Sequence, residues 1–226
     1  APAIDMDLLY WSRHFRNMPG EGDLPVTDFM RAVMATGYAG PISLEIFNDQ
    51  FRGGAPKTIA LDGYRSLIAL MDDVRRAEPG VDGDLPNLPA RVGVRDTSFV
   101  EFAAQGDELG RMEALLASLG FRRAGRHVSK DVGVWKQGDI RIVLNAETKG
   151  HAGTAWAARG TTVCDVGLTV QDAQETVARA TALGAKTFSQ PLGTGELPIP
   201  AIRGLGNSVM HFLDEDTLSE VWDVEF

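Results

Sequence analysis

Three side chains near the start of the sequence have types and spacing suited to binding a small anion. Ser12 and Arg16 stand four residues apart in "WSRHFRNMPGEG", and Glu45 lies in "GPISLEIF". An arginine guanidinium is a planar fork that can bind a carboxylate through two parallel hydrogen bonds. Glu45 ends an apolar stretch, where an uncompensated charge is costly, so it needs a partner such as an inward-facing Arg or Lys.

The neighbours of Arg16 leave its role open to alternatives. Arg13 and His14, which are adjacent to each other and precede it in the same loop, could take its place, and each of these side chains could instead be a solvated loop charge. His14 has the residue type of a general base, but the sequence shows no carboxylate that would orient it, so we assign it no role.

Over residues 1–76 the sequence predicts alternating strands and helices, which would position these side chains. We expect a strand in "AIDMDLLYWS", a helix in "LPVTDFMRAVMATGY" and a second strand in "GPISLEIF". A closing helix in "LDGYRSLIALMDDVRRA" presents a buried face of Leu61, Leu67, Ile68, Leu70 and Met71. This order is the repeating unit of parallel α/β structures, and both candidate segments follow strands, where (β/α)₈ barrels carry out their chemistry.

Composition limits the partners. The 226 residues carry a formal charge of −9, which argues against nucleic acid and anionic membranes and leaves a small anionic substrate bound by local Arg side chains. The single cysteine, Cys164, lies in an apolar run, so we expect a buried thiol and a cytoplasmic protein. No apolar run approaches the roughly 20 residues of a membrane span.

Residues 77–91, "AEPGVDGDLPNLPAR", have the composition of a linker between units 1–76 and 92–226.

The second unit contains an internal repeat. "SFVEFAAQGDELGRMEALLASLGFRRAGR" and "VCDVGLTVQDAQETVARATALGAKTFSQ" each read as a strand, an amphipathic helix and a Leu-Gly stop before an extended stretch. Gly120 and Gly184 fit helix C-caps in the left-handed conformation. Two further strands follow each copy, so the repeat is βαβββ. The apolar positions of the two helices are Met112, Leu115, Leu116 and Leu119 in the first and Val177, Ala180 and Leu183 in the second.

Two tandem βαβββ copies resemble a domain of the vicinal-oxygen-chelate superfamily, and "LGF", "QGDIRIVLN" and "IPAIRGLGNS" are most similar to the N-terminal half of 4-hydroxyphenylpyruvate dioxygenase. The family binds its metal through two His and one Glu; the matching positions here carry Phe99, Asp165 and His211. This set is not a facial triad, so we expect no metal in 92–226. Without a metal, His211 would be a partly buried, hydrogen-bonded residue and Asp165 a strand-end carboxylate near solvent. The domain would then serve as a scaffold, a homo-oligomer contact or a vestigial pocket.

The first unit resembles the last two βα units of xylose-isomerase-like sugar phosphate isomerase/epimerase barrels. The combination "SRHFRNMPGEG", "GPISLEIFNDQFR", "DGYRSL", a linker and a dioxygenase-type domain is similar to bacterial 3-dehydroshikimate dehydratases that carry a dioxygenase-like extension. The resulting fold class is α/β plus α+β: the end of a TIM-type barrel followed by a two-module domain. The resemblance implies that Glu45 is one of four ligands of a divalent Mn, Mg or Co ion, and that Ser12 and Arg16 contact the anionic substrate.

The implied reaction removes water from 3-dehydroshikimate to give protocatechuate, a step of quinate and shikimate degradation. A (β/α)₈ barrel takes about 250 residues, so the base and the other ligands are expected outside this sequence. We therefore interpret the chain as an internal piece of a longer polypeptide that is inactive alone. An alternative is a non-catalytic protein whose two-module domain binds a ligand or mediates dimerisation, and a working dioxygenase is a weaker alternative.

Overall fold

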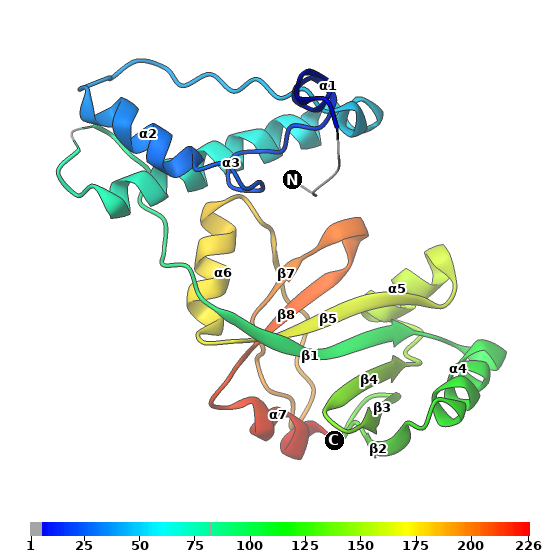
Figure 1. The fold of residues 1–226 in the computed structure, drawn as a ribbon. Helices are drawn as coiled ribbons and strands as arrows, with labels where there is room; N and C mark the ends of the chain where they lie inside the picture. Colours follow the sequence, from blue (N-terminus) through cyan, green and yellow to red (C-terminus); the bar gives the residue numbers. More distant parts are fainter. Residues whose placement is uncertain (1–5, 82) are drawn as a thin grey trace. The chain divides into compact units, whose positions relative to one another are not determined.

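The computed structural model describes residues 6–81 and 83–226 (Figure 1), which fall into two compact units, Ala1–Leu88 and Pro89–Phe226. The boundary lies inside the Pro- and Gly-rich stretch 77–91. No helix in the described ranges is long and apolar enough to cross a membrane.

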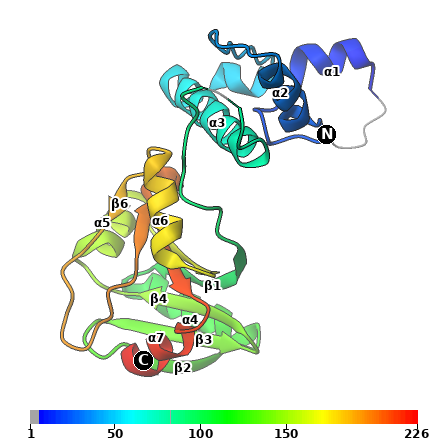
Figure 2. The same ribbon diagram turned by 90° about the vertical axis from the view of Figure 1, so that its left-hand side faces the viewer.

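The first unit is built on two helices that pack side by side (Figure 2), α2 (Val26–Ala35) and α3 (Pro56–Ala77). α3 begins with Pro56, whose missing N–H would have no partner in a first turn. Both predicted helices are confirmed, although Leu61, which we expected on the buried face of α3, is 41% exposed. The core between the helices consists of Met30, Met34, Leu70, Met71 and Val74.

The predicted strand "AIDMDLLYWS" is wrong where it falls on described residues, because these residues form the helix α1 (Leu8–His14). Residues 3–5 of that prediction lie outside the described part of the chain. Asp7 caps α1: its Oδ1 accepts hydrogen bonds from the backbone N–H groups of Leu9 (2.7 Å) and Tyr10 (3.1 Å). No residue of α1 is buried, so local capping rather than packing holds this helix.

The second expected strand, "GPISLEIF", is also wrong as a strand. A strand is defined by hydrogen bonds to a neighbour, and no neighbouring strand exists among the described residues of this unit. The stretch between α2 and the 3₁₀ helix η1 (Asp49–Gly53) is a coil whose end forms one isolated antiparallel bridge, between Phe15 and Asn48.

The second unit is a single eight-stranded sheet with the order β2-β3-β4-β1-β5-β8-β7-β6. Its centre is the antiparallel pair β1 and β5, and each of these strands pairs in parallel with the last strand of its own module (Figure 1). The strands are β1 (Val94–Ala103), β2 (Arg122–Arg126), β3 (Val132–Gln137), β4 (Ile140–Asn145), β5 (Thr162–Val170), β6 (Thr187–Phe188), β7 (Ala201–Arg203) and β8 (Val209–Asp214).

The predicted βαβββ repeat is confirmed, with α4 (Gly106–Ser118) in the first copy and α6 (Ala173–Ala182) in the second. Both helices end in the same way. Gly120 (φ 89°) and Gly184 (φ 86°) adopt the left-handed conformation, and the following residue of each donates to a carbonyl five residues earlier. This is the hydrogen bonding of a Schellman cap.

Side chains alternate between two cores on opposite faces of the sheet. Leu144, for example, packs with Leu116 of α4, whereas its neighbour Val143 packs on the other face with Phe99. Met112 also packs under α4, but Leu115 and Leu119, which we expected on its apolar face, are largely exposed.

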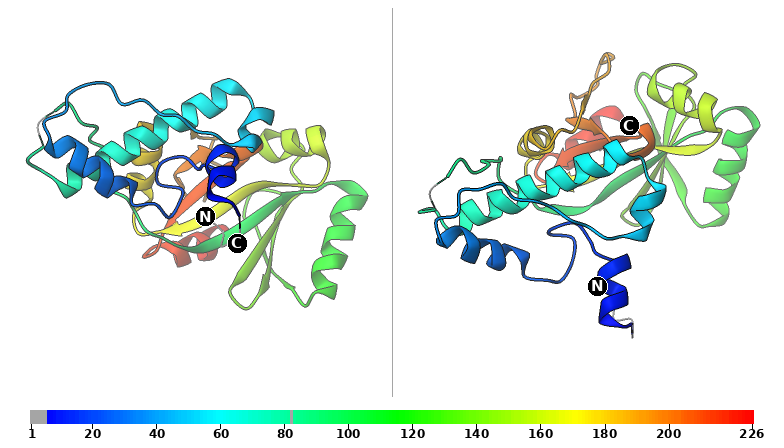
Figure 3. Two further views of the ribbon diagram at one scale, coloured as in Figure 1. Left: turned by 45° about the horizontal axis from the view of Figure 1, so that its top comes forward. Right: turned by 90° about the horizontal axis from the view of Figure 1, so that it is seen from above.

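Two helices of the second unit were not predicted, α5 (Gly150–Arg159) and α7 (Leu218–Glu225). α5 covers small side chains, Ala103 and Cys164, which confirms the buried thiol. α4 and α5 lie toward one end of the sheet and α6 toward the other (Figure 3). α7 contributes to the core around Phe99, which contains Phe99, Val132, Val134, Val143, Leu213 and Val221, with Leu197, Ile199, Leu218, Trp222 and Phe226 against it.

Candidate functional site

The coil that carries Glu45 has one face toward the helices and one face toward solvent. Ile42 packs on the core of α2 and α3, and a methyl group added at the buried Gly63 of α3 would lie 3.0 Å from Leu44 Cδ2. Ser43, Glu45 and Phe47 alternate with these positions and are exposed. Glu45 therefore lies on the face away from the helix layer, and in this structure its carboxylate is solvated rather than held in an apolar environment.

Arg16 is attached to the end of this coil. Its backbone N–H donates to the carbonyl of Phe47 (3.0 Å), and its guanidinium carbon lies 4.9 Å from the centre of the Phe47 ring. Its Nε donates to the carbonyl of Ser12, while the Ser12 hydroxyl donates to the carbonyl of Leu9 (2.9 Å). The structure thus brings Ser12 and Arg16 together, and it places Arg16 beside the segment that contains Glu45.

A carboxylate that the sequence did not reveal orients His14. Nδ1 of His14 lies 2.8 Å from Oδ2 of Asp49, 35 residues away in the sequence. The ring also lies 4.5 Å from the ring of Tyr10. The contact depends on how the chain folds, so no local sequence signal predicts it. Arg13, in contrast, is exposed.

The described residues contain no group of three or more His, Cys, Asp or Glu side chains placed to hold a metal ion. A complete metal site is therefore not formed within the described ranges. Glu45 offers one carboxylate, on a surface open to further ligands.

In the second unit, Phe99, which the resemblance matches to a metal-ligand position, packs against a glycine. Phe99, Gly167 and His211 lie in register on β1, β5 and β8. A methyl group added at Gly167 would lie 2.2 Å from the Phe99 ring, so this ring rests directly on the glycine backbone. Trp222 of α7 packs edge-on against the same ring at 5.8 Å. The site is packed with aromatic side chains.

Next to Phe99 lies a buried group of acidic residues. Nδ1 of His211 is 2.6 Å from Oδ2 of Asp165, which confirms that His211 is partly buried and polar-paired. Asp165 is only 5% exposed, so the expectation that it lies near solvent is wrong; β1 and β8 cover its strand on both sides. Glu101, which we did not single out, faces Asp165 across β1 and β5.

Burial and the nearby Asp165 charge raise the pKa of Glu101 to about 7, although hydrogen bonds from Asn145 and Cys164 oppose this shift. Burial lowers the pKa of His211, but the hydrogen bond and charge of Asp165 outweigh it and leave this pKa raised. A pKa of about 7 means that Glu101 takes up a proton near neutral pH, while the raised pKa of His211 favours the protonated imidazole beside Asp165.

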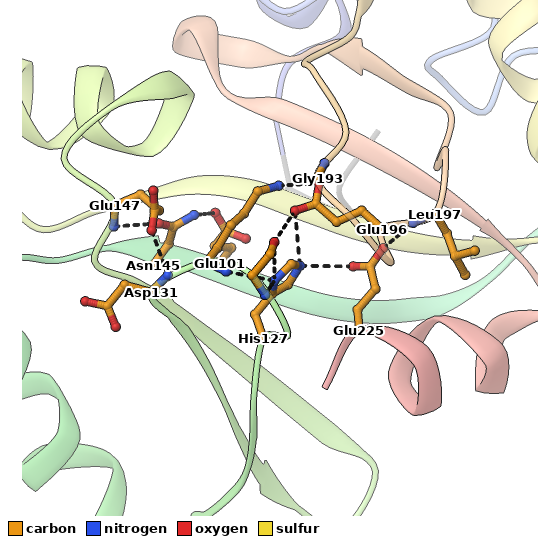
Figure 4. Close-up of polar contacts among 11 residues, drawn as sticks. Glu101, His127, Asp131, Asn145, Glu147, Gly193, Glu196, Leu197 and Glu225 are labelled. Carbon is orange, nitrogen blue, oxygen red and sulfur yellow. Dashed lines mark hydrogen bonds and ion pairs between the residues drawn. The ribbon is translucent and has the colours of Figure 1, made fainter.

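A second polar cluster joins α7 to the 189–200 segment (Figure 4). Nδ1 of His127 accepts from the backbone N–H groups of Ser129 and Lys130 (both 3.2 Å), so its proton is on Nε2, 3.5 Å from Oε2 of Glu225. Burial raises the pKa of Glu196, but hydrogen bonds from Gly193, Ser129 and Lys130 outweigh it and lower this pKa to about 2. These contacts hold α7 in the position in which its residue Trp222 packs against Phe99.

A family model described as "Hydroxyphenylpyruvate dioxygenase, HPPD, N-terminal" matches residues 89–226. Through these residues the chain belongs to this family. The matched residues are those that form the two paired βαβββ modules. A 4-hydroxyphenylpyruvate dioxygenase from Pseudomonas aeruginosa is 32% identical to this chain over 136 residues, which are 60% of this chain and 38% of that protein.

The whole chain, including the first unit, is similar to two proteins named 3-dehydroshikimate dehydratase. It is 39% identical over 235 residues to that of Pseudomonas putida and 40% identical over 232 residues to that of Pseudomonas aeruginosa. The chain spans 36% and 37% of their lengths. A solved structure of a "xylose isomerase-like TIM barrel/4-hydroxyphenylpyruvate dioxygenase fusion protein" matches 100% of this chain and 37% of its own, with 36% identity and a TM-score of 0.82. The expected order of a barrel part and a dioxygenase-type domain is confirmed.

Proposed function

We propose that this chain is part of a metal-dependent lyase that dehydrates 3-dehydroshikimate to protocatechuate. The two dehydratases similar over the whole chain support the reaction. The structural observation that carries the proposal is the exposed face of the coil before η1, where Glu45 and Phe47 point away from the helices and Phe47 contacts Arg16. In a barrel, strand residues that face away from the helix layer face the interior, where ligands bind.

Glu45 would hold a divalent Mn, Mg or Co ion as one of several oxygen ligands, the others being supplied from outside this chain. Such an ion, when bound, polarises a carbonyl oxygen and stabilises negative charge that develops on it. Arg16 would bind the substrate carboxylate, with Ser12 as a neighbouring polar contact. The catalytic base remains assigned to no residue of this chain.

We assign no reaction to the second unit, which would act as a scaffold or as a contact between copies of the chain. The packing of Phe99, Gly167 and Trp222 supports this proposal, because the Phe99 ring lies directly against the Gly167 backbone and the Trp222 ring, so that side chains occupy this position. The same packing argues against a dioxygenase centre in residues 92–226.

The test is an assay of protocatechuate formation by the complete gene product that carries these residues. We expect activity that a chelator removes and a divalent ion restores. Glu45→Gln should lower kcat about 10- to 100-fold because it weakens a metal ligand, whereas Glu21→Gln, a change in the neighbouring loop, should leave kcat within about twofold. Full activity of Glu45→Gln at limiting metal would contradict the assignment.

A further inference from the structure

Asn48 joins two segments that lie 32 residues apart in the sequence. Its side-chain Nδ2 donates to the backbone carbonyl of Arg16 at 2.9 Å. Its Oδ1 accepts from the backbone N–H of Gln50, also at 2.9 Å, and so caps η1. Its backbone forms the isolated bridge with Phe15. One amide side chain therefore uses its donor on the Arg16 segment and its acceptor on its own segment.

These contacts fix the backbone of Arg16 on both sides of its Cα atom. The N–H of Arg16 donates to Phe47, and its carbonyl accepts from Asn48. The guanidinium is held against the Phe47 ring, and Nε is bonded to the carbonyl of Ser12. The two terminal nitrogens make no hydrogen bond to any of the described residues, so the fork of the guanidinium stays available for a ligand.

We propose that Asn48 is a positioning residue that holds Arg16 in the orientation in which its guanidinium binds the substrate carboxylate. This inference rests on the proposed function, in which Arg16 is the carboxylate-binding residue. The physical reason is preorganisation: a loop that is already ordered loses less conformational entropy when the ligand binds. The His14–Asp49 pair lies next to this link and supports the same two segments at 2.8 Å.

Asn48 could instead act only as the cap of η1, and Asn48→Asp separates the two roles. Aspartate keeps an oxygen that can accept from Gln50, but it has no N–H group for the Arg16 carbonyl. Asn48→Ala removes both bonds. A capping role therefore predicts that Asn48→Ala is impaired and Asn48→Asp is not, whereas a positioning role predicts that both variants are impaired.

The experiment measures the affinity of the complete gene product, with metal, for protocatechuate and for catechol, which lacks the carboxylate. We expect Asn48→Asp to weaken protocatechuate binding about tenfold, the equivalent of about one buried hydrogen bond, and to leave catechol binding unchanged. KM for the substrate should rise more than kcat falls. Gln50→Ala, an exposed amide two residues away, is the matched control and should change neither affinity.

A double-mutant cycle with Arg16→Gln decides between direct and indirect action. Arg16→Gln alone should abolish the preference for protocatechuate, and Asn48→Asp should have no further effect in that background. Two results would overturn the positioning role of Asn48 while leaving the role of Arg16 intact. One is an Asn48→Asp variant that still prefers protocatechuate over catechol as strongly as the unmodified protein. The other is an Asn48→Asp change that weakens protocatechuate binding equally in the unmodified protein and in Arg16→Gln. An unchanged preference in Arg16→Gln would overturn both, and dehydratase activity measured on the same sample reports separately on the reaction.

Discussion

Replacing Glu101 with Gln should change how the stability of the second unit depends on pH. The pKa of Glu101 is about 7 in the folded protein and 4.5 as the ordinary value. Because the folded-state pKa is raised, its stabilising contribution is fully present below pH 4.5 and is lost as the pH rises through 7. The raised pKa of His211 acts in the same direction at higher pH.

The difference between the two pKa values corresponds to about 3 kcal/mol of unfolding free energy, of which about 2 kcal/mol is lost between pH 5 and pH 8. A glutamine side chain cannot ionise, but its Oε1 can still accept from Asn145 Nδ2 (2.9 Å) and from the Cys164 thiol (3.4 Å). Glu101→Gln should therefore be more stable than the unmodified protein at pH 8, and its stability should vary less with pH.

The assay is urea unfolding of the 226-residue chain at pH 5, 6, 7 and 8, followed by tryptophan fluorescence. Three of the four tryptophans, Trp135, Trp156 and Trp222, lie in the second unit and report on it. Glu220→Gln, at an exposed position of α7, is the matched control and should keep the pH dependence of the unmodified protein. If Glu101→Gln also keeps that dependence, Glu101 does not take up its proton in this range and the reasoning is refuted.

Gly167→Ala should destabilise the second unit by about 1–3 kcal/mol or more, because the new methyl group would overlap the Phe99 ring. Phe99→Ala should destabilise it by about 3–5 kcal/mol, because the change leaves a cavity. In urea unfolding the double variant should lose less than the sum of the two. Glu196→Gln should lower stability at pH 7, and the difference should shrink as the pH falls toward 2, because a lowered pKa stabilises above 4.5 and loses that effect on acidification. Asp72→Asn should speed hydrogen exchange of residues 84–88, because the buried Asp72 carboxylate accepts from the backbone N–H of Leu88 and from both arginines at the end of α3.

Each of these expectations can fail separately. Additive costs at Phe99 and Gly167 would show that the ring and the glycine do not constrain each other. A constant difference between Glu196→Gln and the unmodified protein from pH 7 to pH 2 would mean that the charge of Glu196 is not what its partners stabilise. Unchanged exchange in Asp72→Asn, with Asp62→Asn at an exposed position of α3 as the comparison, would show that 84–88 is held by packing alone.

The fold of the second unit could be predicted because each of its signals is local. The glycines after the two helices, the alternation of apolar residues and the similar spacing of the two copies are all visible within about thirty residues of sequence. α5 was missed because its residues are mostly small and make no strong apolar stripe. The burial of Asp165 could not be predicted, since it depends on strands β1 and β8, which come from distant parts of the chain.

For the candidate site of the first unit, the sequence could predict which residues take part but could not predict how they contact one another. Ser12, Arg16 and Glu45 follow from their chemistry and from resemblance, but the link through Phe47 and Asn48 spans more than thirty residues. The two expected strands failed for a physical reason. A parallel strand is stabilised mainly by its neighbours, and without them the segment near residue 8 follows its local capping signal and becomes helical.

The boundary at Leu88 and Pro89 has a practical consequence for anyone who divides this protein into parts. Arg76 Nη2 donates to the carbonyl of Leu88, and Arg179 Nη1 donates to the carbonyl of Pro89, so each half of the stretch 77–91 is bonded to the unit beside it. A fragment that ends at residue 76 loses residues 77–88, which include the Leu88 carbonyl bonded to Arg76 of α3. A fragment that begins at residue 92 loses residues 89–91, which include the Pro89 carbonyl bonded to Arg179 of α6. Expression of either unit alone should therefore cut the chain between residues 88 and 89, at a peptide bond that composition alone does not distinguish from its neighbours.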